Sequence, residues 1–176
     1  MNELARGLLK VRALARAGDV DGLMAELENP LEIGGIATRG RAADYLAQLG
    51  AKQAVPRLVE LLRKDPHDGV RTHAVRALGE IGTADVVGPV RSALEDRSDA
   101  VRSWAAHHLG ELGDIGAVPK LIALLDDDDW ALRRTTAEAL AKLGDPKAVE
   151  PLNAARARER FIRRRHITRA LRALAK

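Results

Sequence analysis

The sequence predicts an all-α fold, a right-handed α-solenoid of stacked antiparallel helical hairpins with a period of 31–32 residues. The first observation is a set of glycines at one phase: Gly18, Gly50, Gly82, Gly113 and Gly144. The second is the helical spacing of apolar residues before them, as in Val70, Ala74, Leu78 and Ile81, and again in Val101, Ala105, Leu109 and Leu112. The third is that no segment alternates polar and apolar residues as a half-buried strand does.

Each period is interpreted as two helices. The glycine ends the first helix, because it adopts the left-handed conformation without steric cost. Asp114 and Asp145 directly follow their glycines and can cap the next helix. A proline falls near the start of each second helix, where it removes no intrahelical hydrogen bond: Pro56, Pro89, Pro119 and Pro151. One hairpin cannot bury its own apolar face, so the hairpins are expected to stack.

These repeats are expected to form a single domain over residues 1–176. Residues 1–37 form an N-terminal capping unit and link, with the link at 31–37 irregular. Residues 38–160 form four regular repeats. Residues 161–176 form a C-terminal capping helix, in which Leu171 and Leu174 are expected to pack on the hairpin of residues 132–155.

The repeated pattern VRxxAAxALGxIGDxxAVxPLxxAL resembles the HEAT-like repeat of the phycobilisome-lyase type over residues 38–174. Proteins with this repeat include bilin lyases, hydroxylases, DNA-repair proteins and scaffolds, so the resemblance implies a fold rather than an activity. It also implies that the first helix of each repeat lines a concave surface.

Once the core positions are assigned, a stripe on each first helix is expected to face solvent at i, i+3 and i+7 spacing. The candidate partner-binding residues on or beside this stripe are Arg41, Asp44, Tyr45, His73, Arg76, Trp104, His107, Glu138 and Arg169. Trp and Arg are preferred anchors of protein interfaces. An alternative interpretation is that Trp104 lies flat over the next helix and covers the gaps left by alanines. Tyr45 and His108 occupy a position that is alanine in other repeats.

Composition argues against catalysis and against bound cofactors or metals. The chain has no cysteine, which excludes disulfides, thiolate metal sites and thiol catalysis. The lack of cysteine also fits a reducing compartment, so a cytoplasmic location is expected. No nucleophile motif or phosphate-binding loop is present. Some repeat hydroxylases bind iron through His-Glu pairs, but here Ala74 follows His73 and Leu109 follows His108.

Two charged patterns receive structural interpretations. The four acids at 126–129 are expected to form a turn that caps the next helix rather than a cation site. Arg71, Arg102 and Arg133 recur at one repeat position and are expected to pair with turn acids such as Asp114 and Asp145.

The C-terminal end is strongly basic, with nine basic residues and one acid from Arg156 onward and a basic patch at Arg163, Arg164 and Arg165. The sequence therefore predicts a non-enzymatic protein-binding adaptor that uses the concave face and binds another protein, one with acidic groups. The alternatives are nucleic-acid or anionic-surface binding through the basic C-terminal helix, and an accessory subunit of a lyase-like enzyme. No membrane-spanning segment is expected.

Overall fold

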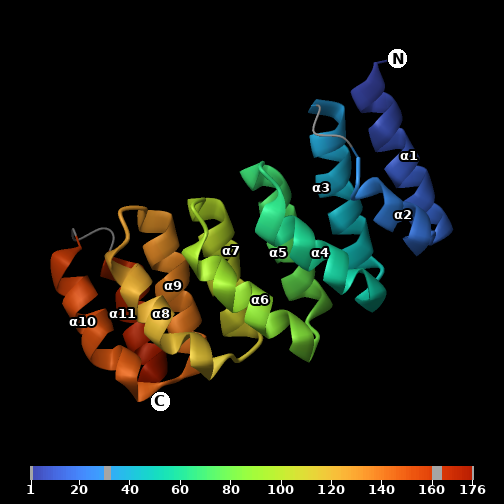
Figure 1. Cartoon of the computed structure of the whole chain (residues 1–176). Helices are drawn as coiled ribbons and strands as arrows, with labels where there is room; N and C mark the ends of the chain where they lie inside the picture. Colours follow the sequence, from blue (N-terminus) through green and yellow to red (C-terminus); the bar gives the residue numbers. More distant parts are fainter. Residues whose placement is uncertain (1, 30–32, 160–163, 176) are drawn as a thin grey trace. The chain divides into compact units, whose positions relative to one another are not determined.

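The computed structural model describes residues 2–29, 33–159 and 164–175, in which every regular element is helical and none is a strand. The first helices of the hairpins are α1 (Glu3–Ala17), α3 (Ile33–Gln48), α5 (Asp68–Ile81), α7 (Asp99–Glu111), α9 (Trp130–Leu143) and α11 (Arg164–Leu174). The second helices are α2 (Val20–Glu26), α4 (Val55–Lys64), α6 (Val87–Ser92), α8 (Val118–Ala123) and α10 (Val149–Arg158). The two kinds alternate along the chain, as Figure 1 shows.

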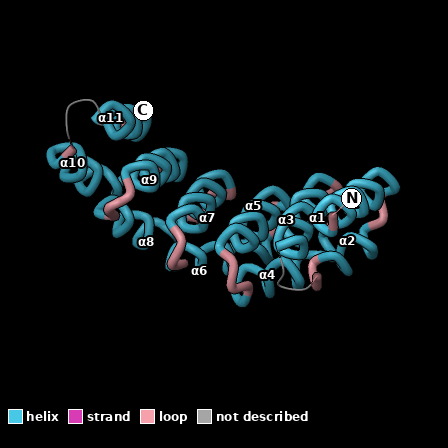
Figure 2. Tube along the Cα trace, turned by 90° about the horizontal axis from the view of Figure 1, so that it is seen from above, coloured by secondary structure: helices cyan, strands magenta, loops and turns pink. Residues whose placement is uncertain are grey.

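The chain divides into two compact units, Met1–Pro89 and Val90–Lys176. In the first unit, α3 packs between α1 and α5, while α2 and α4 pack on α3 and α5. In the second unit, α9 packs between α7 and α11, while α8 and α10 pack on α9 and α11. Within each unit the first helices form one row and the second helices another (Figure 2). The single-domain organisation stays a prediction.

The core of each unit consists of small and branched aliphatic side chains. Leu78, Leu109 and Leu140, which share one repeat position, are each 0% exposed. The helices approach closely where residues are small: a Cβ added at Gly110 would lie 2.9 Å from the Cα of Ala139. Interiors packed at this density leave no room for larger side chains between α7 and α9.

The predicted helix ends are confirmed. The five phased glycines all have positive φ, from 61° at Gly50 to 71° at Gly144. The carboxylate of Asp114 accepts a hydrogen bond from the Gly116 amide, and that of Asp145 accepts one from the Lys147 amide. The turn chemistry predicted from the sequence therefore sets the boundary between the two helices of each hairpin.

The N-terminal link differs from the prediction. Residues 31–37 were expected to be irregular, but α3 already begins at Ile33. The Gly34 backbone lies against α1, because a Cβ added at Gly34 would be 3.5 Å from the Leu4 nitrogen. The Thr38 hydroxyl donates a hydrogen bond to the Gly34 carbonyl at 2.7 Å. Packing on α1 thus outweighs the poor helix propensity of the glycines. Residues 30–32 lie outside the described residues.

The predicted capping helix is present as α11 and packs on α9 and α10. Its buried residues are Ile167 and Ala170, whereas Leu171 and Leu174 are only partly buried. The packing of these two leucines on the hairpin of residues 132–155 stays a prediction.

Candidate functional site

In each unit, the exposed side of the row of first helices is called the first-helix face. In the first unit this face contains a buried carboxylate. Asp44 is 3% exposed. His73 Nδ1 lies 2.8 Å from Asp44 Oδ1, and Arg41 Nη1 lies 3.5 Å from Oδ2. Arg76 Nη2 forms an ion pair with Oδ1. The expectation that Asp44 faces solvent is wrong, because three cationic or hydrogen-bonding side chains from α3 and α5 close over it.

The charge state of this cluster follows from its geometry. Burial opposes ionisation of Asp44, but the hydrogen bond and charge of His73 and the charges of Arg76 and Arg41 outweigh it, so the pKa of Asp44 is lowered from 3.8. The carboxylate is therefore ionised at neutral pH. Gly40 leaves space for the arrangement, because a Cβ there would lie 2.6 Å from His73 Cδ2. Arg41, His73 and Arg76 are thus engaged within the unit.

In the second unit the corresponding positions carry aromatic rings. The Trp104 ring stacks on His108 with centroids 5.6 Å apart and 24° between planes, and it meets His107 edge-on at 5.6 Å. His108 is 6% exposed, whereas Trp104 and His107 are partly exposed. His108 stands where Ala77 and Ala139 stand in other repeats, and it fixes the indole from the buried side. Trp104 is therefore both a packed residue and part of the surface.

A groove of about 310 Å³ lies between α9 and α11 of the same unit, and Trp104 is not among its lining residues. Its apolar lining is alanine, at Ala141, Ala170 and Ala173, and its polar lining is Glu138, Lys142, His166 and Arg169. Lys142 also forms an ion pair with Glu111 of α7. The groove is thus joined to the helix that carries Trp104. Two predicted site residues, Glu138 and Arg169, are brought together here.

His166 is the titratable residue of the groove that is most affected by burial. Burial lowers its pKa from 6.5, more than the nearby charges of Glu159 and Glu138 raise it. Its Nε2 atom is buried without a hydrogen-bond partner in the described part of the chain. The neutral imidazole is therefore favoured, because protonation would place a charge in a poorly solvated position.

Tyr45 lies away from the Asp44 carboxylate and lines a different groove, of about 240 Å³, between α1 and α3. Arg12 and Arg16 of α1 form its basic side. Sequence reasoning did not select these two arginines, although their i, i+4 spacing places them on one side of the helix.

The recurring arginines Arg71, Arg102 and Arg133, called the arginine ladder below, have the predicted structural role. Their partners differ from the predicted ones. The side chain of Arg102 pairs with Asp127 at 2.9 Å and that of Arg133 with Glu159 at 2.6 Å, and Arg71 donates to the carbonyl of Asp65. The predicted partners are engaged elsewhere: Asp114 pairs with Arg91 at 2.6 Å, and Asp145 caps a turn. These acids follow the first helix, whereas the ladder reaches the turn after the second helix.

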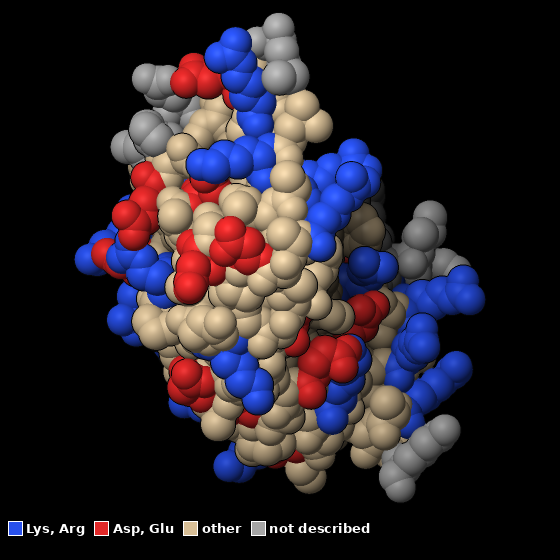
Figure 3. All heavy atoms as spheres, turned by 90° about the vertical axis from the view of Figure 1, so that its right-hand side faces the viewer, with Lys and Arg blue, Asp and Glu red and all other residues tan. Residues whose placement is uncertain are grey.

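The ladder includes one member that the sequence analysis missed. Arg39 stands 32 residues before Arg71, and its guanidinium lies 2.9 Å from the Asp65 carboxylate, with both side chains nearly inaccessible. The repeat spacing was the signal for it. On the surface drawn in Figure 3, acidic and basic side chains lie next to one another in many places.

The acidic run is a structural turn, as predicted. Asp129 caps α9 by accepting from the Leu132 amide, and Asp126 forms an ion pair with Arg158. Among the described residues, no group of three His, Cys, Asp or Glu side chains could hold a metal ion. Trp130, which opens α9, is 45% exposed and has the Arg134 guanidinium 5.9 Å from its ring centroid.

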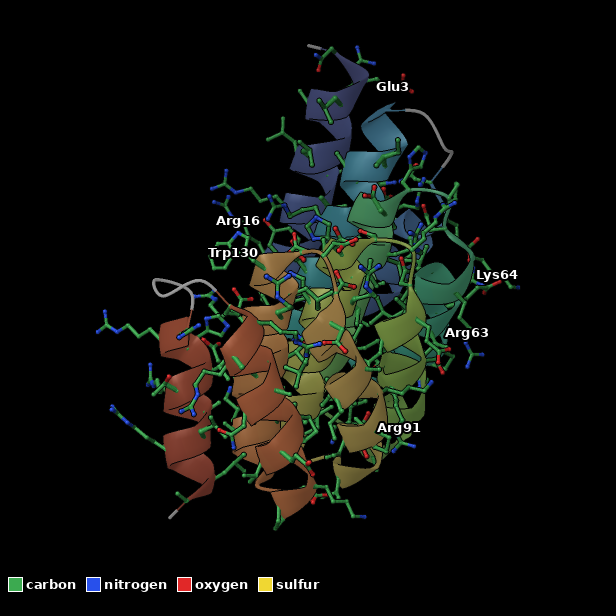
Figure 4. All side chains as sticks on the ribbon, turned by 90° about the vertical axis from the view of Figure 1, so that its left-hand side faces the viewer. Glu3, Arg16, Arg63, Lys64, Arg91 and Trp130 are labelled. Atoms are coloured by element: carbon green, nitrogen blue, oxygen red, sulfur yellow. The ribbon has the colours of Figure 1, made fainter. Side chains whose placement is uncertain are left out.

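The predicted basic patch is only partly described. Arg163 lies outside the described residues. Arg164 donates to the carbonyls of Glu159 and Ala157, so it anchors α11 to the end of α10. Arg165 is exposed, as are Arg169 and Arg172 further along α11. Figure 4 shows nitrogen-tipped side chains extending outward from this helix. None of the described helices is long and apolar enough to cross a membrane.

Comparison with solved structures shows the same fold in several repeat proteins. Computationally designed armadillo repeat proteins for modular peptide recognition match with a TM-score of 0.68 and 20% identity, over 93% of this chain and 85% of theirs. A designed armadillo repeat protein in complex with the peptide (KR)4 matches with a TM-score of 0.68 and 21% identity, over 93% and 85%. The complex of CpcE and CpcF of phycocyanin lyase from Nostoc sp. PCC7120 matches with a TM-score of 0.68 and 22% identity, over 88% and 98%.

Human deoxyhypusine hydroxylase is more distant, with a TM-score of 0.59 and 18% identity over 96% of this chain and 80% of that protein. No curated protein matches the sequence. The family model for HEAT repeats matches residues 20–99 and again 87–172, which together span most of the chain. The resemblance found in the repeat pattern is confirmed, and the chain belongs to the HEAT-repeat family.

Proposed function

We propose that this protein is a non-enzymatic adaptor that binds a segment of another protein on the first-helix face of its second unit. The observation that carries the proposal is a fixed, partly exposed tryptophan on α7 together with a groove between α9 and α11 in the same unit. Trp104 is held on the buried His108 ring, and Lys142 links its helix to the groove between α9 and α11. A pre-oriented aromatic anchor loses little conformational entropy when a partner covers it.

The chemistry of the groove supports a polypeptide ligand. Its alanine lining accepts apolar side chains, and Glu138, Lys142, His166 and Arg169 offer polar contacts around it. Arg169 is exposed, and no carboxylate of the described residues lies within 4.0 Å of it, so it is available to a carboxylate of the partner. The partner segment is accordingly expected to combine an apolar residue with an acidic one.

The comparisons support binding as the class of function. Armadillo repeat proteins designed for peptide recognition share this fold, and one of them was solved with a peptide. A catalytic role is not proposed, because an indole, alanines and dispersed charges suit contact with a partner better than bond making. The expected location is the cytoplasm, in keeping with the lack of cysteine.

A selection of peptides from a random displayed library against the folded protein tests the proposal. Enriched peptides would be measured against Lys142→Ala and against a matched control, Lys120→Ala. Both lysines are about equally exposed, at 43% and 41%, and each pairs with a glutamate, but Lys120 lies on α8 in the other row. Weaker binding to Lys142→Ala alone is expected. Equal affinity for both variants would place the binding surface elsewhere.

Binding of a nucleic acid is the second candidate, and one observation favours it. Arg165, Arg169 and Arg172 are exposed on α11 at i, i+4 and i+7, and no carboxylate of the described residues pairs with them. Phosphate contacts of this kind weaken steeply with added salt. Titration of labelled single-stranded DNA at low and high salt, with Arg172→Gln as the variant, tests this role independently of Lys142.

A further inference from the structure

The groove between α1 and α3 in the first unit combines basic and apolar groups. Arg12, Ala15 and Arg16 line it from α1, and Tyr45, Gln48 and Leu49 line it from α3. Its volume is about 240 Å³, which is large enough for one or two side chains of a ligand rather than a large cofactor. It belongs entirely to the first unit and shares no residue with the groove between α9 and α11.

The two arginines of this groove differ from Arg39, Arg57 and Arg76 of the same unit. Arg12 and Arg16 are exposed one turn apart, and no carboxylate of the described residues lies within 4.0 Å of either guanidinium. Elsewhere in the unit, side chains pair with carboxylates: Arg39 with Asp65, Arg57 with Glu28 and Glu60, and Arg76 with Asp44. Like charges at i, i+4 destabilise a helix, so this pair opposes folding slightly.

The helix dipole accounts for only one of the two charges. Arg16 lies in the last turn of α1, where a cation interacts favourably with the carbonyl end of the helix. Arg12 lies more than one turn from that end, and the dipole effect falls off within the last turn. A local structural reason for keeping Arg12 beside Arg16 is therefore missing, while both face the same groove.

The α3 side of the groove adds contacts of a different kind. Leu49 is 42% exposed, and the Tyr45 ring is partly buried. The Tyr45 hydroxyl has no hydrogen-bond partner within the described part of the chain, and Gln48 is exposed beside it. A ligand that satisfies the groove must bring negative charge to the arginines and an apolar group to Leu49.

We propose that this groove binds an acidic segment of a partner protein, with carboxylates on Arg12 and Arg16 and a neighbouring apolar side chain against Leu49 and Tyr45. Guanidinium groups bind carboxylates through paired hydrogen bonds. A nucleic acid fits less well, because a phosphate backbone is neutralised by an extended series of cations, whereas this groove pairs two arginines with an apolar wall. The site is independent of the function proposed for the second unit.

Fluorescence anisotropy with a labelled peptide of alternating glutamate and leucine residues tests the site on the full chain. The double variant Arg12→Gln/Arg16→Gln is compared with Arg63→Gln/Lys64→Gln, which removes the same charge from exposed positions of the same unit. Figure 4 shows Arg16 on one side of the molecule and Arg63 and Lys64 on the other. We expect affinity to fall about tenfold in the groove variant and by less than about twofold in the control.

The same titrations with labelled single-stranded DNA separate the two classes of ligand. The proposal is supported if the peptide binds the wild-type protein and loses affinity only in the groove variant. It is overturned if the peptide does not bind, if both double variants lose affinity equally, or if DNA shows the larger and groove-specific loss. Circular dichroism of both variants excludes unfolding as the cause, since all four side chains are exposed.

Discussion

The two units place different chemistry at the same positions of one repeat. In the first unit, Asp44 is buried and draws Arg41, His73 and Arg76 into a closed ionic cluster. In the second unit, the position of His73 holds Trp104, whose ring stacks on a buried histidine and remains partly exposed. The repeat therefore determines where a side chain lies, whereas its neighbours determine whether a partner can reach it.

A large effect is expected from removing the carboxylate of the ionic cluster. Asp44→Ala removes the buried anion that His73, Arg76 and Arg41 share, so the free energy of unfolding should fall by about 1.5–3 kcal/mol. Urea unfolding measures the loss. In contrast, Glu111→Gln breaks an ion pair that is about half exposed in the second unit and should cost less than about 1 kcal/mol. Equal losses would remove the distinction between the units.

The same substitution should also change how the free energy of unfolding depends on pH in acid. The pKa of Asp44 is lowered in the folded protein, so its contribution is present above the ordinary pKa near 3.8 and is lost as the pH falls through the lower folded value. Asp44→Ala should therefore show a shallower loss of stability below about pH 4 than the wild-type protein.

The framework itself should respond alike in both units. Leu78 and Leu109 occupy one repeat position and are each 0% exposed. Leu78→Ala and Leu109→Ala should each lower the free energy of unfolding by about 2–5 kcal/mol through lost burial and the cavity left behind. Thermal or urea unfolding gives both values. A small effect at one position would show that the two repeats do not share a register.

A smaller effect is expected from the titration of His166. Because burial lowers its pKa from 6.5, the stability that it contributes is fully present above that value and declines as the pH falls through the folded pKa. His166→Gln should reduce the difference in unfolding free energy between about pH 8 and about pH 5. Other histidines titrate in both proteins, so the difference between the two pH profiles is the measurement. Parallel profiles would show that His166 is solvated.

The sequence predicted the framework well because local chemistry and periodicity determine it. The phased glycines, the Asp114 and Asp145 caps and the buried leucines all follow from turn chemistry and helical spacing. The helix at residues 33–37 was missed because packing of Gly34 on α1, a contact between distant segments, stabilises it against its glycines.

The site was harder to predict because it depends on which side chains meet between helices. The predicted solvent-facing stripe of the first helices includes Asp44. Its position there did not indicate that His73 and Arg76 of α5 would bury its carboxylate. The same stripe omitted Arg12 and Arg16, which lie before the first regular repeat and line a groove with Tyr45. Both errors concern contacts between neighbouring helices, which spacing within one helix does not specify.

Trp104, held on the His108 ring, is proposed to anchor a partner segment. Isothermal titration of a selected peptide against Trp104→Ala tests this role. Trp130→Ala is the control, because Trp130 is also exposed but lies at the start of α9, outside the ring stack of Trp104 and His108. We expect Trp104→Ala to weaken binding by more than about 1 kcal/mol and the control to change it little. Unchanged affinity in Trp104→Ala, with a clear loss of thermal stability, would show that Trp104 serves packing alone and is not an anchor.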